Sequence, residues 1–101
     1  MNLQILWTPI AEATFQETIK YLTSEWSEST AYQFIVRTHA ILDNLSAFPF
    51  MYKCINDKLK IRKGLINKHI SFFYRIKASS IEILYFWDNR RNPDDSEYNF
   101  E

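Results

Sequence analysis

The hydrophobic pattern of this chain changes its period close to residue 50. From Ala11 to that point apolar residues recur every three or four positions, and after it they alternate with polar ones. The first spacing is typical of an amphipathic helix and the second of a half-buried strand. The sequence therefore predicts an α+β fold, in which a layer of helices covers one face of a sheet.

Two helices are predicted in the first half. Thr8 and Pro9 suit the cap and the first turn of a helix, and Ser27 or Ser29 suits the cap of a second one. The first apolar stripe comprises Ala11, Phe15, Ile19, Leu22 and Trp26. The second comprises Ala31, Phe34, Ile35, Thr38, Ile41, Leu42 and Leu45, and ends before Phe48-Pro49. Because few residues join the two helices, we expect an antiparallel hairpin.

Four strands are predicted around these helices. The first contains Leu3, Ile5 and Trp7, and the other three follow a loop over residues 50–58. Their alternating apolar positions are Leu59 and Ile61; Ile70, Phe72, Tyr74 and Ile76; and Ile81, Ile83, Tyr85 and Trp87. Gly64, the only glycine, is expected at a bulge or at the end of a strand. The predicted order is β-α-α-β-β-β, with the helix hairpin packed on one face of a small, mainly antiparallel sheet.

The composition suits one domain over residues 1–101, of which residues 88–101 form a polar C-terminal tail. The chain has 101 residues, 47% of them hydrophobic, which is enough for one core. No apolar run approaches the roughly 20 residues of a membrane span, and the N-terminus lacks the pattern of a signal peptide, so we expect a cytoplasmic protein. With a single cysteine, Cys54, and two scattered histidines, we expect neither a disulfide nor a metal or other cofactor.

The formal net charge is zero, but the charges are segregated along the chain. Residues 1–52 carry two basic and five acidic side chains, and residues 53–91 carry ten basic and three acidic ones, a net of +7. The last ten residues add four acidic groups. A local basic block attracts polyanions even in a neutral protein.

The basic block supplies the candidate binding residues. Arg90 and Arg91 follow the last predicted strand, where their planar guanidinium groups suit a phosphate or a carboxylate. Lys60 and Arg62 alternate with Leu59 and Ile61, so both are expected to point away from the helix-covered face and to join a basic surface. The alternative is that all four are ordinary solvated side chains.

Other polar and aromatic residues of the sheet have structural explanations. A two-residue turn at Ala78-Ser79 places Arg75 across from Glu82, which favours a cross-strand ion pair. The aromatic side chains of the last two strands share faces with isoleucines and are interpreted as packing residues. Cys54 has no neighbouring base and is a poor candidate for a nucleophile.

Taken in order, several short motifs resemble the RelE/ParE toxins over nearly the whole chain. These are Trp7-Thr8-Pro9, Ala11 and Ala13, Tyr21-Leu22 before Trp26, Ala31 and Phe34, Leu45 before Pro49, Tyr74-Arg75-Ile76, Ile83-Leu84, and Arg90-Arg91-Asn92-Pro93. The resemblance implies the toxin of a type II toxin–antitoxin, or plasmid stabilisation, system. It also implies a cognate antitoxin that wraps around the domain as a hetero-oligomer.

The resemblance leaves two targets open. The RelE-like branch cleaves messenger RNA in the ribosome, and Lys60, Arg62, Arg91 and Tyr98 resemble its catalytic residues. The ParE-like branch poisons DNA gyrase without nuclease chemistry, so whether this chain is an enzyme depends on the branch. Ser71 stands where the nucleases commonly carry an Arg, and Arg90-Arg91-Asn92-Pro93 looks more like ParE. The ParE-like branch is therefore preferred, with Arg90, Arg91, Lys60 and Arg62 as target-binding residues.

A third hypothesis is a non-toxic basic binding module that has kept the fold and lost the activity, because fold alone does not fix function. Toxicity on expression in bacteria would separate this module from both kinds of toxin.

Overall fold

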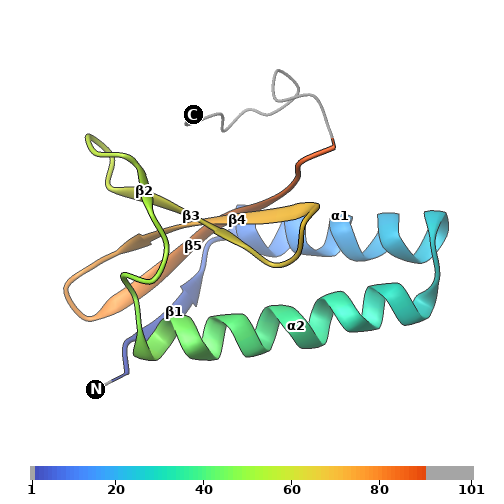
Figure 1. Ribbon diagram of the computed structural model, residues 1–101, viewed down its shortest axis with the longest axis horizontal. Coiled ribbons are helices and arrows are strands. Elements are labelled where there is room, and N and C mark those ends of the chain that lie inside the picture. The colour runs from blue at the N-terminus through green and yellow to red at the C-terminus, as the bar shows by residue number, and fades with distance from the viewer. Residues whose placement is uncertain (1, 91–101) are drawn as a thin grey trace.

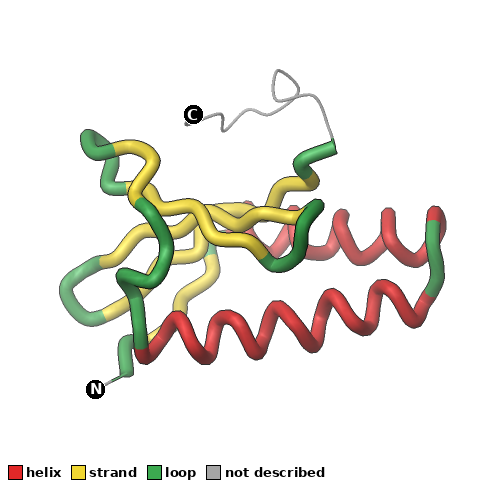
Figure 2. Tube along the Cα trace, in the orientation of Figure 1, coloured by secondary structure: helices red, strands yellow, loops and turns green. Residues whose placement is uncertain are grey.

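The computed structural model describes residues 2–90, which form two layers (Figure 1). The helical layer contains α1 (Pro9–Glu25) and α2 (Glu28–Ala47). The sheet contains β1 (Gln4–Trp7), β2 (Cys54–Asn56), β3 (Ile61–Leu65), β4 (Ile70–Ile76) and β5 (Ser80–Asp88). Figure 2 shows both helices on the same side of the sheet. The predicted α+β architecture is confirmed, with β2 as a short additional strand inside the segment that was expected to be a loop.

Side-chain caps set the start of both helices, as the sequence predicts. The Thr8 hydroxyl accepts a hydrogen bond from the Ala11 N–H at 3.0 Å, and the Ser27 hydroxyl accepts one from the Thr30 N–H at 3.0 Å. Each cap satisfies a backbone donor that has no partner within its helix. Only Trp26 and Ser27 separate the helices, which therefore run antiparallel (Figure 1).

The sheet has the strand order β1-β5-β4-β3-β2, so β5 lies beside both the first strand and β4. β1 pairs with β5 in parallel, and the other three pairs are antiparallel. The predicted hairpin between β4 and β5 is present, and the Lys77 N–H donates to the Ser80 carbonyl at 2.8 Å across it. Arg75 pairs with Glu82 as expected, with 2.9 Å between Nη2 and Oε1.

The main core lies between the helices and the sheet. Phe34 and Leu45 are buried in it as predicted, and Ile41 is half-buried against it. Trp26 is the exception on the predicted stripes, because it follows the last residue of α1 and is 61% exposed.

A bulge in β5 changes which residues face the helices. Phe73 is opposite Tyr85 and Tyr74 is opposite Ile83, which leaves Leu84 as the extra residue. The Thr8 hydroxyl donates to the carbonyls of Ile83 and Leu84, at 3.0 and 2.9 Å. The end of β1 thus holds the irregular backbone that the bulge creates.

Because of this bulge, Tyr85 packs on the face away from the helices, in a cluster with Ile61 and Phe73. The Phe73 and Tyr85 rings stack with their centroids 4.4 Å apart. The expectation that Tyr85 and Trp87 share the face of Ile81 and Ile83 is therefore wrong, although their interpretation as packing residues is confirmed.

Gly64 lies inside β3, directly opposite Phe72, and neither bulge in the sheet involves it. A Cβ at this position would be 2.4 Å from Cε1 and 2.5 Å from Cζ of Phe72, and 3.0 Å from Cδ2 of Tyr52. The glycine is needed because an aromatic ring lies directly over the backbone, rather than for a turn or a bulge.

Candidate functional site

Arg90 lies just beyond the end of β5 and is held there by Asp88. Its Nε donates to Asp88 Oδ1 at 2.9 Å, its Nη2 donates to Oδ2 at 2.5 Å, and its backbone N–H also donates to Oδ1. The Asp88 residue is only 8% exposed. Burial on its own would raise the pKa of Asp88, but the hydrogen bonds and charge of Arg90, with the charge of His69, hold it below its usual value. The carboxylate is therefore ionised at neutral pH and acts as an acceptor.

Aromatic residues at the end of α1 complete the surroundings of Arg90. The centre of its guanidinium is 5.6 Å from the ring centroid of Tyr21 and 5.8 Å from that of Trp26. Both distances are within the range of a cation–π interaction. Arg90 thus connects the end of β5 to the end of α1 and is not the freely solvated loop residue that the alternative sequence interpretation describes.

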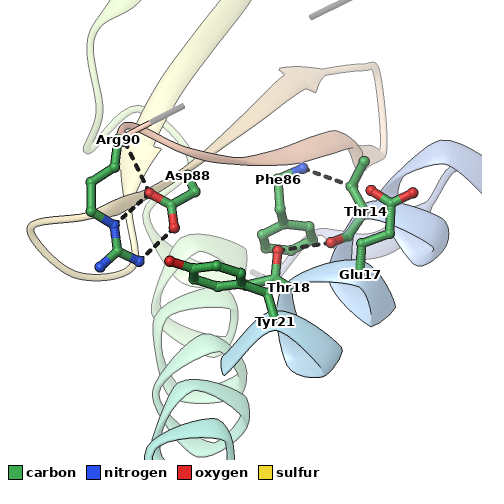
Figure 3. Close-up of a pocket in the computed structure, with 7 residues that line it drawn as sticks. All are labelled: Thr14, Glu17, Thr18, Tyr21, Phe86, Asp88 and Arg90. Atoms are coloured by element: carbon green, nitrogen blue, oxygen red, sulfur yellow. Dashed lines mark hydrogen bonds and ion pairs between the residues drawn. The ribbon is translucent and has the colours of Figure 1, made fainter. Parts of the chain in front are cut away.

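A pocket of about 330 Å³ opens between α1 and β5, and the Asp88–Arg90 pair forms one end of it (Figure 3). Thr14, Glu17, Thr18, Tyr21 and Phe86 complete its lining. The Thr14 hydroxyl accepts a hydrogen bond from the Phe86 N–H at 3.0 Å, so it is already used to hold α1 against β5. The pocket offers hydroxyls and carboxylates, which suit hydrogen bonding to a ligand.

The structure corrects the predicted placement of Lys60 and Arg62. Lys60 precedes β3 and has a φ of 59°, so it belongs to the turn and not to an alternating strand. Arg62 is opposite Tyr74, whose side chain is in the core on the helix side of the sheet. Directly opposed residues of antiparallel strands point to the same face. The expectation that Arg62 points away from the helices is therefore wrong, because Ile61 packs with Phe73 and Tyr85 on that face and leaves Arg62 on the helix side.

Arg62 is engaged by the segment that precedes β2. Its Nη1 donates to the Tyr52 carbonyl at 2.6 Å, and its guanidinium lies 4.9 Å from the ring centroid of Phe50. This group fixes the loop after α2 to the sheet.

Arg62 and Arg90 lie at opposite ends of the sheet and do not form one cluster. Arg62 is opposite Tyr74, whereas Asp88, which holds Arg90, is opposite Ile70. Those two β4 positions are four residues apart, or about 13 Å at 3.3 Å per residue. Arg91 and Tyr98, the other two candidates, lie outside the described residues.

Ser71 has a structural role at the end of the sheet that contains Arg90. It is fully buried, and its hydroxyl donates to Asn89 Oδ1 at 3.1 Å and accepts from Asn89 Nδ2 at 2.8 Å. The Asn89 N–H also donates to the His69 carbonyl. These contacts position the turn that carries Arg90, and the sequence pattern contained no signal for them.

Cys54 is half-buried in β2, and its thiol lies 3.5 Å from the carbonyl oxygen of Asn56. Among residues 2–90, no group of three His, Cys, Asp or Glu side chains is arranged to hold a metal ion. Neither helix in this part of the chain is long and apolar enough to cross a membrane.

Solved structures of toxins share this architecture. A chain of the chromosomal ParDE toxin–antitoxin system from P. aeruginosa aligns with a TM-score of 0.71 and 15% identity, over 85% of this chain and 95% of that one. A YoeB/ParE toxin from Agrobacterium tumefaciens aligns with a TM-score of 0.63 and 13% identity, over 85% of this chain and 98% of that one. The fold is therefore that of the RelE/ParE toxins.

The family is shown by the sequence itself. Residues 5–93 match the model of the ParE toxin of the type II toxin–antitoxin system parDE. The chain belongs to this ParE toxin family, and it is the toxin component of a type II system whose partner is an antitoxin. A search of curated proteins finds no match.

Proposed function

We propose that this toxin acts on DNA gyrase, as the ParE-like branch does, and does not cleave messenger RNA. The observation that carries the proposal is the distance between its basic residues, since Arg62 and Arg90 lie at opposite ends of the sheet and each is engaged by its own partners. A nuclease needs several cations around one scissile phosphate to stabilise the developing charge. Gyrase is a cytoplasmic enzyme, so the proposed site of action is the cytoplasm.

Ser71 adds support from the same part of the fold. The position where the nucleases commonly carry an Arg is fully buried here and is hydrogen-bonded to Asn89. A guanidinium at this position would need a charged partner to offset its desolvation. Restoring an Arg there would therefore disrupt the turn that carries Arg90.

The target can be assigned with purified protein in two assays run side by side. One measures gyrase-cleaved DNA that accumulates in the presence of the toxin, and the other measures cleavage of messenger RNA in the ribosomal A site. We expect cleaved gyrase complexes and intact messenger RNA. Cleavage of messenger RNA without gyrase trapping would establish the RelE-like alternative, and a folded protein without toxicity in bacteria would establish the binding module.

For target contact we propose Arg90 and Arg91, with Lys60 and Arg62 as a second basic element. Lys60→Asn is the informative change at the second element, because it removes the charge while Asn tolerates a positive φ. Lys58→Ala is the matched control, since Lys58 is an exposed residue of the same turn region. If the second element contacts gyrase, Lys60→Asn should reduce trapping and Lys58→Ala should not.

We further propose that the antitoxin engages the basic segment 53–91 with an acidic chain, by adding a strand or laying down a helix. The short strand β2 lies in this segment and forms an edge of the sheet, so it suits strand addition. Binding of the co-expressed antitoxin should weaken as the salt concentration rises. Affinity that is independent of salt would show that apolar contacts dominate instead.

A further inference from the structure

A second hollow shares Arg90 with the pocket of Figure 3 and lies between residues 22–37 of the two helices and residues 67–70 of the hairpin that joins β3 to β4. We call it the hairpin groove, and its volume is about 510 Å³. Arg37, Lys68, His69 and Arg90 contribute to its walls, and Trp26 lies at its edge. Within residues 2–90, no carboxylate contributes to its lining. The groove is therefore suited to an anion.

These basic side chains come from separate parts of the sequence, and hydrogen bonds fix the backbone that presents them. Arg37 is one of only two basic residues before residue 53, and its Nε donates to the Ile66 carbonyl, which ties α2 to the hairpin. Asn67 Oδ1 accepts from the N–H groups of His69 and Ile70, at 2.8 and 2.9 Å. The hairpin that carries Lys68 is thus held in one conformation. Such a prearranged site loses little entropy when a ligand binds.

Trp26 distinguishes this groove from an ordinary basic surface. This residue is 61% exposed and lies beside the Arg90 guanidinium. A flat aromatic ring next to fixed cations is the arrangement that binds single-stranded nucleic acid, with a base on the ring and the phosphates on the cations. An acidic peptide would use the cations but would gain less from the ring.

We propose that the hairpin groove binds a single nucleic-acid strand, with a base stacked on Trp26 and the adjacent phosphates contacted by Lys68 and Arg37. This inference goes beyond the proposed function and does not depend on which target is correct. Both gyrase–DNA and ribosome–messenger RNA complexes contain nucleic acid. The proposal thus holds for either branch and is tested without either target.

The test uses the full-length protein and a ten-residue oligothymidylate, followed by tryptophan fluorescence and by salt titration. We expect binding that quenches the fluorescence, and we expect no quenching in Trp26→Phe although the oligonucleotide still binds. Trp26→Ala should weaken binding by about 5- to 150-fold, because stacking on one aromatic ring stabilises a single-stranded complex by about 1–3 kcal/mol. Both changes are at an exposed position, so an unaltered melting temperature confirms that the variants are folded.

The phosphate contact is tested by charge. Lys68→Ala should lower the slope of log affinity against log salt by about 0.7, the value for one lost phosphate contact with a single strand. Lys58→Ala removes an equally exposed lysine outside the groove and should leave the slope unchanged. Equal effects of the two changes, or no binding of the oligonucleotide, would overturn the proposal. Equal affinity and equal quenching with poly-L-glutamate would also overturn it, and would identify the groove as a site for an acidic peptide.

Discussion

Replacing Gly64 with alanine should destabilise the fold because no room exists for a single methyl group. Carbon atoms in contact are normally about 3.5–4.0 Å apart, whereas the new Cβ would be 2.4 Å from Cε1 of Phe72. The ring must therefore move by about 1 Å in a close-packed core. Phe72 is fully buried, and the rings of Tyr52, Tyr74 and Phe86 lie 5.7, 5.6 and 6.3 Å from it between centroids. These neighbouring rings oppose a movement of the Phe72 ring.

Overpacking of this kind costs about 1–3 kcal/mol. The lower chain entropy of alanine in the unfolded state returns about 0.4–1 kcal/mol. We therefore expect Gly64→Ala to lower the free energy of unfolding by about 1–2 kcal/mol. For a domain of this size, that loss lowers the melting temperature by roughly 4–16 °C.

Thermal and urea denaturation measure this effect, and a second substitution tests its cause. Phe72→Leu removes the ring atoms that the methyl group meets, so the double variant Gly64→Ala/Phe72→Leu should be more stable than the sum of the single effects predicts. Leu65→Ala is the neighbouring control, because Leu65 is 50% exposed. A melting temperature unchanged by Gly64→Ala, or strict additivity in the double variant, would refute the argument.

Four further predictions concern other parts of the fold. Phe34→Ala should lower the free energy of unfolding by about 2–5 kcal/mol, because Phe34 is a core residue that is only 2% exposed. Calorimetry should show the unfolding, and toxicity should be lost with it. Cys54→Ser should leave toxicity intact, as measured by growth after induction. Burial raises the pKa of Tyr74 from 10.0 to about 12. The unfolded chain therefore loses this proton first, and the free energy of unfolding should fall by about 2–3 kcal/mol as the pH rises from 10 to 12. Tyr74→Phe should remove this loss. Arg90→Ala should lower the free energy of unfolding by about 2 kcal/mol in urea denaturation, whereas Arg91→Ala, at a position expected to be exposed, should change it by less than about 0.5 kcal/mol.

The helices and most of the strands were predictable because local patterns determine them. Thr8-Pro9 and Ser27 cap the helices where expected, and Phe34 and Leu45 occupy the predicted core. Tertiary contacts decide the parts that were missed. The three-residue strand β2 is too short to show a period, and it forms by pairing with β3.

The bulge at Leu84 shows why strand faces were harder to predict than strands. Residues 81–87 are apolar at nearly every position, so the sequence fits either face after the extra residue. The Thr8 hydroxyl, more than 70 residues away in the sequence, satisfies the carbonyls at the bulge. No local pattern contains that information, and Tyr85 and Trp87 were consequently placed on the wrong face.

Arg90 is the candidate site residue whose surroundings differ most from the sequence-based prediction. The sequence identified a guanidinium at the end of a strand, available to a phosphate or a carboxylate, but Asp88, two residues earlier, already provides the carboxylate. Removing Arg90 leaves a nearly buried negative charge without its partner, which is destabilising whatever the toxin binds. Loss of toxicity in Arg90→Ala therefore identifies a target contact only if the folded fraction is unchanged at the assay temperature. Arg90→Lys is the more selective substitution, because a lysine keeps one charge for Asp88 but lacks the planar fork that binds two oxygens at once.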